Sequence, residues 1–214
     1  MAKAPDQIRT PPRLYLVATL GNDPAATAAA LIPALGAGDV AAVLLRLAAA
    51  DERTLINRIK EIAPAVQDRG IALLLDGRAD LVARAGADGA HATEIEAIKD
   101  AIGTLKPDRI VGAGGLASRH DAMEAAQAGA DYVMFGEPDA AGKRPSFEAI
   151  QDRVAWWSEV FEVPCVAYAD SIAEVDALGA ADFVALGPFV FDDPRGPAAA
   201  VADAAARLAA ETPA

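Results

Sequence analysis

The chain has 214 residues, of which 53% are hydrophobic, and a formal net charge of −12 at pH 7. A chain of this length and composition can fill one sizeable core, and α/β barrels commonly reach this length as a single domain. The negative charge argues against nucleic acid or an anionic membrane as the main partner, because both bind clusters of Lys and Arg. A phosphorylated small molecule remains compatible with it, provided that a few basic side chains converge locally.

The cysteine count and the hydropathy of the sequence exclude some classes of protein. One cysteine, Cys165, excludes an internal disulfide, and its place at the start of an apolar strand favours a buried small hydrophobe over a nucleophile. No apolar run approaches the ~20 residues of a membrane-spanning helix, and the N-terminal residues lack the hydrophobic core of a signal peptide. We therefore expect a flexible lead-in over residues 1–12, one domain over 13–214, and a cytoplasmic location.

Eight apolar segments alternate with helical segments along the chain. Asp23 with Pro24, and later Asp51, mark helix starts, while Ser118 with Asp121 and Ser171 with Glu174 resemble capping boxes. The strands are expected at 14–20, 40–47, 71–75, a segment ending at 91, 109–112, 131–135, 164–168 and 182–186. The helices are expected at 24–35, 51–69, 79–85, 93–102, 118–128 and 146–161, after Ser171, and in the alanine-rich segment after residue 197.

A short repeat indicates how these elements combine. The segments that begin at Gly86, Gly129 and Gly179 each read as a helix stop followed by a strand, and the glycines are spaced by 43 and 50 residues. Each interval is long enough for two strand–helix units. The strands are continuous apolar runs, as expected when both faces of a parallel sheet are covered. The sequence therefore predicts a single (β/α)8 TIM barrel. An open doubly wound sheet is the alternative, but 20–24 lacks the glycine-rich phosphate turn that it requires.

In a barrel of this kind the loops after the strands form the active site. Arg46 and the Lys143–Arg144 pair follow the second and sixth strands, and together they would suit an anionic ligand. The glycines of the loop 113–115 precede a helix, where exposed amides can bind a phosphate. Simpler interpretations stay open: a solvated basic loop, glycines that serve a tight turn, and a hydrogen-bonded core histidine at His91. The other candidates are Asp76–Arg78, Glu94, Glu96, Gly136–Glu137, Asp170–Ser171 and 187–195.

The order of these segments resembles the thiamine phosphate synthase and thiazole tautomerase superfamily, over roughly residues 13–205. The most specific parts are Gly86-Ala-Asp-Gly-Ala-His91 and Gly129-Ala-Asp-Tyr-Val-Met-Phe-Gly136 with the later Lys143. The resemblance implies a (β/α)8 barrel that joins a pyrimidine pyrophosphate to a thiazole phosphate with Mg²⁺ and releases pyrophosphate. A sister branch aromatises the thiazole phosphate without a metal. Arg46 and Lys143 would match the pyrophosphate-binding Arg and Lys of the family, and Asp76 stands where the synthases have Asn.

Several family positions differ in this chain. A lysine of the family is Ala48, one metal-binding Asp is Gly77 and the second is Glu96. A Gly-Gly phosphate loop becomes Asp170–Ser171, and the loop 114–117 lacks the histidine that the tautomerases use. Because Mg²⁺ normally neutralises the charge that accumulates on departing pyrophosphate, the loss of ligands predicts weak Mg²⁺ binding through Glu96.

We therefore expect a thiamine-phosphate-synthase-like transferase of thiamine biosynthesis in which the metal and phosphate motifs are partly lost. Two alternatives remain open: a non-catalytic or regulatory barrel that binds a phosphate ligand, and an enzyme of the tautomerase type or with another small substrate. A homodimer is among the oligomeric states that the sequence leaves open. The catalytic candidates are Arg46, Lys143 and Asp76. The ligand-binding candidates are Gly112, Gly114, Gly115, Gly136, Arg78 and His91, and the metal candidate is Glu96.

Overall fold

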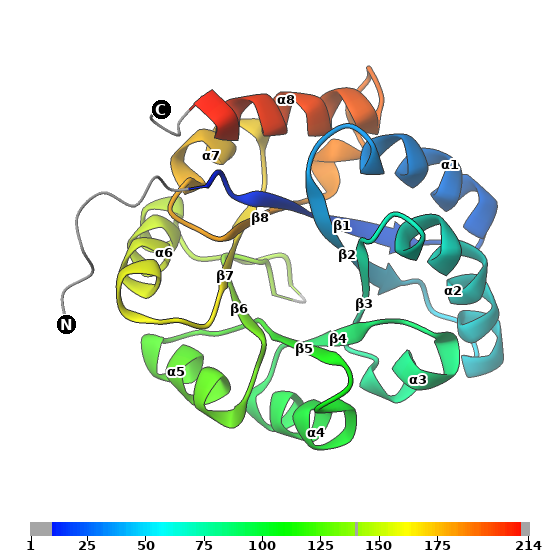
Figure 1. The fold of residues 1–214 in the computed structure, drawn as a ribbon, viewed down its shortest axis with the longest axis horizontal. Coiled ribbons are helices and arrows are strands. Elements are labelled where there is room, and N and C mark those ends of the chain that lie inside the picture. Colours follow the sequence, from blue (N-terminus) through cyan, green and yellow to red (C-terminus); the bar gives the residue numbers. More distant parts are fainter. Residues whose placement is uncertain (1–9, 140, 211–214) are drawn as a thin grey trace.

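A computed structural model describes residues 10–139 and 141–210 of the chain. Eight parallel strands in this part of the chain pair in sequence order, and β8 returns to β1, so the sheet is closed. Helices surround the strands as an outer ring (Figure 1). The predicted (β/α)8 TIM barrel is confirmed. Most of the predicted lead-in, residues 1–9, lies outside the described residues.

The strand bounds agree with the predicted ones to within two residues. The strands are β1 (Arg13–Leu20), β2 (Val40–Leu47), β3 (Ala72–Asp76), β4 (Gly89–Ala92), β5 (Ile110–Ala113), β6 (Tyr132–Phe135), β7 (Cys165–Ala169) and β8 (Phe183–Leu186). The helices are α1 (Pro24–Leu35), α2 (Glu52–Gln67), α3 (Val82–Ala85), α4 (Ile95–Leu105), α5 (Arg119–Ala128), α6 (Phe147–Val160), α7 (Ile172–Val175) and α8 (Pro197–Ala210). Short 3-10 turns lie at Ala79–Leu81, Asp176–Leu178 and Pro188–Val190.

Most of the predicted helix starts are present, with one exception. Asp23 and Asp51 accept hydrogen bonds from first-turn amides, and Ser118 with Asp121 forms the expected capping box of α5. The predicted capping box at Ser171 is wrong, because the Ser171 side chain makes no cap hydrogen bond. Glu174 instead accepts from the Asp170 amide and pairs with Arg144, which lies in the loop after β6. A neighbouring basic side chain thus takes the carboxylate that the sequence assigned to the cap.

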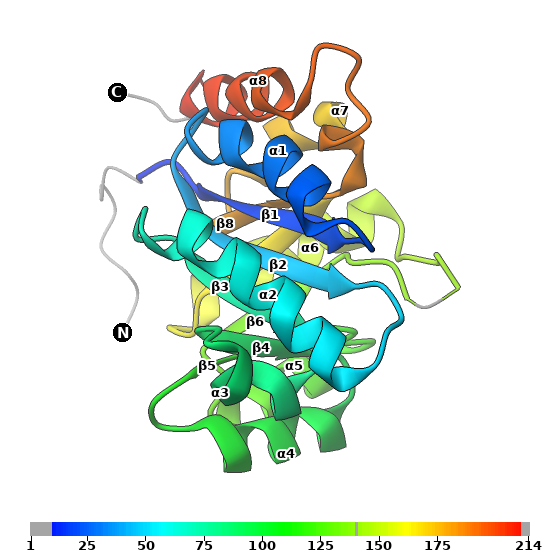
Figure 2. The same cartoon turned by 90° about the vertical axis from the view of Figure 1, so that its right-hand side faces the viewer.

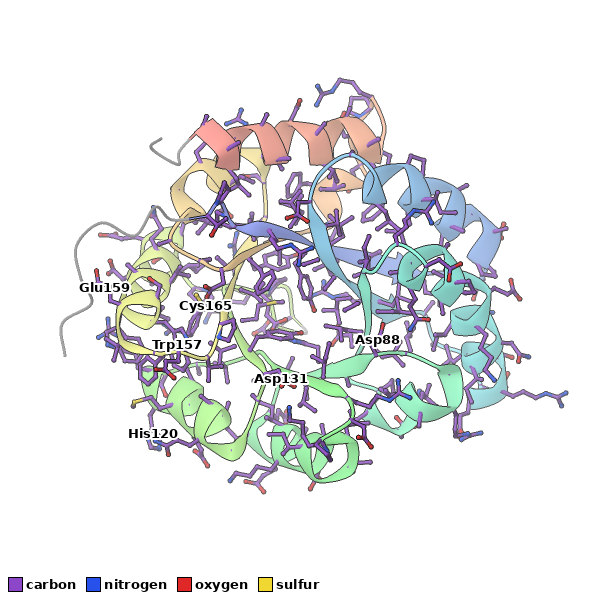
Figure 3. All side chains as sticks on the ribbon, viewed as in Figure 1. Asp88, His120, Asp131, Trp157, Glu159 and Cys165 are labelled. Carbon is purple, nitrogen blue, oxygen red and sulfur yellow. The ribbon has the colours of Figure 1, made fainter. Side chains whose placement is uncertain are left out.

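The aspartate of each sequence repeat accepts a hydrogen bond from a strand amide at the amino-terminal end of the barrel strands. The Asp88 carboxylate accepts from the Leu73 amide at 2.8 Å, and Asp131 accepts in the same way from Val111 at 2.8 Å. Asp182 does so from Cys165, also at 2.8 Å. Asp88 and Asp131 accordingly lie on the ring of strands, whereas His120 and Glu159 lie on the outer helices (Figure 3). The repeat is therefore a structural device that satisfies strand amides at the end of the barrel opposite to the active-site loops.

Two buried cores hold the barrel together. The larger core fills the space between the strands and the helices, and Trp157 of α6 is fully buried there. The smaller core fills the barrel interior and contains Tyr15, Tyr132 and Tyr168. Hydroxyl groups therefore enter an otherwise apolar interior, where each needs a polar partner. None of the helices in the described part of the chain has the length and apolarity that crossing a bilayer requires.

Candidate active site

Inward-facing polar side chains form a layer at the carboxyl ends of neighbouring strands. The register pairs Thr19 of β1 with Arg46 of β2, and Asp76 of β3 with His91 of β4. Because paired positions of parallel strands lie at one level, these side chains meet at the mouth. The Arg46 Nε donates to Asp76 Oδ2 at 3.3 Å, and both side chains are about one quarter exposed, at 29% and 27%.

His91 and Glu137 form a buried ion pair beside this layer. His91 Nε2 lies 3.1 Å and 3.2 Å from the two Glu137 carboxylate oxygens. The His91 side chain has no exposed surface, and that of Glu137 is 6% exposed. The Gly115 amide, in the loop after β5, also donates to Glu137. A single carboxylate therefore ties the ends of β4, β5 and β6 together.

A chain of hydroxyl groups continues from His91 into the barrel. Tyr132 Oη lies 3.0 Å from His91 Nδ1 and 2.8 Å from Tyr15 Oη. Tyr168 is different, because its buried hydroxyl has no hydrogen-bond partner among the described residues. Burial raises the pKa of Tyr168, and the nearby Arg46 guanidinium opposes that rise. The hydroxyl groups of Tyr15 and Tyr132 thus have hydrogen-bond partners inside the barrel, whereas that of Tyr168 lies near the Arg46 guanidinium.

The surroundings set the charges of these groups. Burial alone would lower the pKa of His91, but the Glu137 carboxylate outweighs it and raises that pKa above its ordinary value. Burial alone would raise the pKa of Glu137, but His91 and the Gly115 amide lower it below its ordinary value. Both shifts favour the charged forms of the pair, imidazolium and carboxylate. Burial raises the pKa of Tyr15, Tyr132 and Tyr168, so these phenols stay neutral and can donate hydrogen bonds.

A cavity of about 680 Å³ opens above this layer. The residues that line it are Arg46, Asp76, Thr93, Glu94, Gly115, Glu137, Pro138, Asp139 and Ala141. Of these described residues, four are carboxylates and only Arg46 is basic. The mouth therefore carries a net negative charge, and an anion entering it needs the guanidinium or a cation that it brings along.

Lys143 lies on an adjoining cavity of about 350 Å³. The two cavities share Gly115, Glu137 and Asp139, so Arg46 and Lys143 border one continuous region from different sides. The loop that carries Lys143 projects beyond the arrowheads of β1 and β2 (Figure 2). Asp139 shapes that loop, because its side chain accepts from the Ala141 and Lys143 amides at 2.9 Å.

Arg144 attaches this loop to the barrel. Its guanidinium donates to the Gly136 and Tyr168 carbonyl oxygens at 3.0 Å, and to both oxygens of Glu174 at 3.0 Å and 2.9 Å. The side chain is 15% exposed, and its guanidinium lies 5.7 Å from the centre of the Tyr168 ring. Arg144 therefore holds the loop, while its neighbour Lys143 is exposed toward the cavity.

The four candidate glycines each make room for a particular neighbour. A Cβ on Gly112 would lie 2.0 Å from the Tyr132 ring, and one on Gly114 would lie 1.8 Å from Glu137 Oε1. Gly115 and Gly136 have φ angles of +61° and +93°, which favour glycine, and lie against Thr93 and Ile150. Close packing against Tyr132 and Ile150 thus favours glycine at 112 and 136, and the position of the Glu137 carboxylate favours glycine at 114 and 115.

Two further candidates lie away from the cavity. Arg78 pairs with Asp80 through two hydrogen bonds, at 2.8 Å and 2.7 Å. Glu96 is 85% exposed and faces Lys99 on α4 at 3.2 Å. Among the described residues, no group of three His, Cys, Asp or Glu side chains converges as a metal site. Glu96 as a Mg²⁺ ligand therefore stays a prediction, and in this structure its carboxylate is paired with Lys99.

Sequence reasoning placed Glu137 among the loop residues but missed its role, and it missed Tyr132, Tyr168 and the anchoring of Arg144. The available signal was indirect: two successive glycines, Gly114 and Gly115, leave space for a large group from another strand. No one-dimensional pattern indicates which group fills that space.

Comparison with known proteins decides the family. The family described as "Thiamine monophosphate synthase" matches residues 14–186. A thiamine-phosphate synthase of Rhodospirillum centenum is 42% identical over 196 residues, which cover 89% of this chain and 95% of that protein. The chain belongs to the thiamine monophosphate synthase family.

A second relative supports this assignment, and one solved structure supports the fold. The thiamine-phosphate synthase of Hyphomonas neptunium is 36% identical over 205 residues, covering 91% of this chain and 93% of that protein. The thiamine phosphate pyrophosphorylase of Pyrococcus furiosus superposes with a TM-score of 0.76 at 20% identity, over 94% and 97% of the two chains. At this identity the superposition supports the barrel fold alone.

Proposed function

We propose that this family member binds a phosphorylated small molecule at the barrel mouth and acts as a transferase of thiamine biosynthesis. The observation that carries the proposal is the placement of Arg46 and Lys143 on two cavities that share Gly115, Glu137 and Asp139. The full-length relatives named thiamine-phosphate synthase support the reaction class. A cytoplasmic location stays a prediction, as does a homodimer.

The proposed reaction joins a thiazole phosphate to a pyrimidine pyrophosphate. A new bond forms between the thiazole nitrogen and the carbon that carries the pyrophosphate, the bond from that carbon to oxygen breaks, and pyrophosphate leaves with the electron pair. Arg46 would stabilise the departing anion from β2, and Lys143 would do so from the loop after β6. Asp76 would keep the Arg46 guanidinium oriented, since it accepts from Nε at 3.3 Å.

The metal requirement is the part of the family reaction that fits this chain least. Glu96 points to Lys99, and Gly77 has no side chain to offer. The chain's own residues therefore supply the positive charge in this proposal, and no step depends on a bound Mg²⁺. EDTA is accordingly expected to leave the affinity for inorganic pyrophosphate unchanged in calorimetry.

Incubation of the purified protein with both substrates tests the transferase proposal. Thiamine phosphate and pyrophosphate should form in equal amounts, measured by chromatography and a coupled phosphate assay. No thiamine phosphate above a no-enzyme control, in the presence of Mg²⁺ and both substrates, would reject the condensation.

One observation favours a second candidate, a barrel that binds a ligand without this chemistry. Four carboxylates line the main cavity against the single guanidinium of Arg46, counting described residues alone. Such a site would suit a ligand with an amine as well as a phosphate, bound either by a non-catalytic barrel or by an enzyme of the tautomerase type. Calorimetry with phosphorylated and amine-bearing metabolites, combined with a negative condensation assay, would select this candidate.

A further inference from the structure

The loop after β5 forms an anion-binding site that the protein fills with its own carboxylate. We call this place the amide site and define it by the Gly115 amide, the open face of Gly114 and His91 Nε2. The Gly114 amide already donates to Ala92 in the barrel ladder at 2.8 Å, so Gly115 supplies the available donor. That donor and His91 Nε2 both face Glu137.

Several features fix Glu137 in the amide site. Its side chain is 6% exposed, and its carboxylate contacts His91 through both oxygens. The absence of a side chain on Gly114 is required, because a Cβ there would lie 1.8 Å from Glu137 Oε1 and 2.3 Å from His91 Nε2. The backbone of Gly115 is held against Thr93 in a left-handed conformation. The shape of the amide site therefore fits a side chain from the loop after β6.

A phosphate group can enter the amide site only by displacing Glu137 or by sharing its donors. Sharing would bring two anions together at a place where burial strengthens their repulsion. The basic side chain of the main cavity, Arg46, donates to Asp76, so part of its charge is already neutralised there. Asp139 and Glu94, which line the same cavity, add further negative charge.

We propose that Glu137 is a specificity-determining residue: it occupies the amide site together with His91 and thereby excludes ligand phosphate from the loop after β5. The phosphate of a ligand is then restricted to the side of the mouth bordered by Arg46 and Lys143. This inference rests on the proposed function only in placing the ligand at this mouth. The glycine loop, which reads from the sequence as a phosphate cradle, is thus the receptor of an internal carboxylate.

Binding of inorganic phosphate to Glu137→Ala tests the proposal independently of any activity. The substitution vacates the amide site and leaves the Gly115 amide and the His91 imidazole as donors. We expect this variant to bind phosphate roughly tenfold or more tightly than the wild type, because charge-assisted hydrogen bonds form in a shielded place. In ¹⁵N-labelled protein, the Gly115 amide resonance should shift on phosphate addition in the variant but not in the wild type.

Two control variants separate occupancy from charge. Glu94→Ala removes one negative charge from the same cavity, and Glu94 makes no side-chain cap contact. Glu137→Gln removes the charge of Glu137 but keeps the site filled. Neither should gain the phosphate-dependent shift of Gly115. A Glu137→Ser variant repeats the test if the alanine variant does not fold.

Three results would overturn the proposal. The first is a saturating phosphate shift of Gly115 in the wild type. The second is an equal gain of affinity in Glu94→Ala and Glu137→Ala. The third is a folded alanine or serine variant that binds phosphate no better than the wild type. If the wild-type protein makes no thiamine phosphate, the proposed function is rejected, but this inference about phosphate binding is not.

Discussion

Arg46 and Arg78 are both arginines that follow a barrel strand, but their surroundings differ. Arg46 lines the main cavity and is oriented by Asp76, whereas Arg78 is engaged with Asp80 at the surface. Because Arg46 borders the cavity and Arg78 is paired with Asp80, substituting each arginine in turn separates contact with the ligand from a general effect of charge.

Arg46→Ala is expected to weaken the binding of inorganic pyrophosphate by roughly 10- to 100-fold, the loss that corresponds to one or two hydrogen bonds to a charged group. Arg78→Ala should change the affinity by less than about twofold, since a surface ion pair contributes little. Titration calorimetry of both variants measures this difference. Equal losses in the two variants would mean that general charge, and not contact with Arg46, governs binding.

The pair of His91 and Glu137 gives the stability of the protein a pH signature. Glu137 has a folded pKa below its ordinary 4.5, so its contribution is complete above pH 4.5 and is lost as the pH falls through the folded pKa. His91 has a folded pKa above its ordinary 6.5, so its contribution is complete below pH 6.5 and is lost as the pH rises through the folded pKa.

A double-mutant cycle isolates this contribution. His91→Gln alone should lower the free energy of unfolding by about 3–5 kcal/mol, because it leaves a buried carboxylate without its partner. The coupling energy between His91→Gln and Glu137→Gln should be largest between pH 4.5 and 6.5 and should fall on both sides. Denaturant unfolding across this pH range provides the measurement. A coupling energy independent of pH would show that the two side chains interact without being charged.

At the scale of elements, the loop after β6 depends on a contact that crosses to β7. Arg144 joins the Gly136 carbonyl at the end of β6 to the Tyr168 carbonyl of β7 and to Glu174 of α7. The loop from Asp139 onward therefore has a fixed base, and Lys143 is carried directly next to the residue that anchors it.

Arg144→Ala should release this loop while leaving the barrel closed. We expect a loss of stability of about 2–4 kcal/mol, because the main-chain carbonyls and Glu174 lose their donors. Hydrogen exchange should accelerate over residues 141–144, and the KM for the pyrophosphate substrate should rise more than kcat falls. Arg195→Ala, in an exposed network with Asp193 and Asp203, is the control and should leave the hydrogen exchange of this loop and the KM unchanged. Unchanged exchange in the Arg144 variant would show that the loop is held by other contacts.

At the scale of the whole molecule, charge opposes the entry of an anionic ligand. The chain carries a formal net charge of −12, and carboxylates outnumber basic groups among the described residues that line the main cavity. The long-range field therefore repels a phosphate, and only the short-range contacts of Arg46 and Lys143 attract it.

Added salt should consequently assist anion binding over a limited range. The screening length falls from about 30 Å at 0.01 M salt to about 8 Å at 0.15 M, which weakens the long-range repulsion more than the short contacts. The affinity for inorganic pyrophosphate should rise severalfold over this range, measured by calorimetry in sodium chloride with EDTA present. A monotonic fall in affinity with salt would instead indicate that local attraction dominates throughout.

The order of the elements and the closed barrel follow from the sequence. Glycine stops, apolar strand segments and the spacing of the repeat are local properties, and local properties fix where strands and helices begin. The repeated aspartates at 88, 131 and 182 add a signal of the same kind, since each lies next to the strand end that it serves. Short segments around His91 and Gly136 likewise indicated the family.

The partners of the charged side chains were decided by the tertiary structure. His91 and Glu137 lie 46 positions apart in the chain, and Arg144 and Glu174 lie 30 apart. Several acceptors of suitable chemistry compete for each donor, and only the closure of the barrel brings one of them within hydrogen-bonding distance. For that reason the sequence left the role of the glycine loop open between a phosphate site and a tight turn, and only the folded structure shows that the Gly115 amide donates to Glu137.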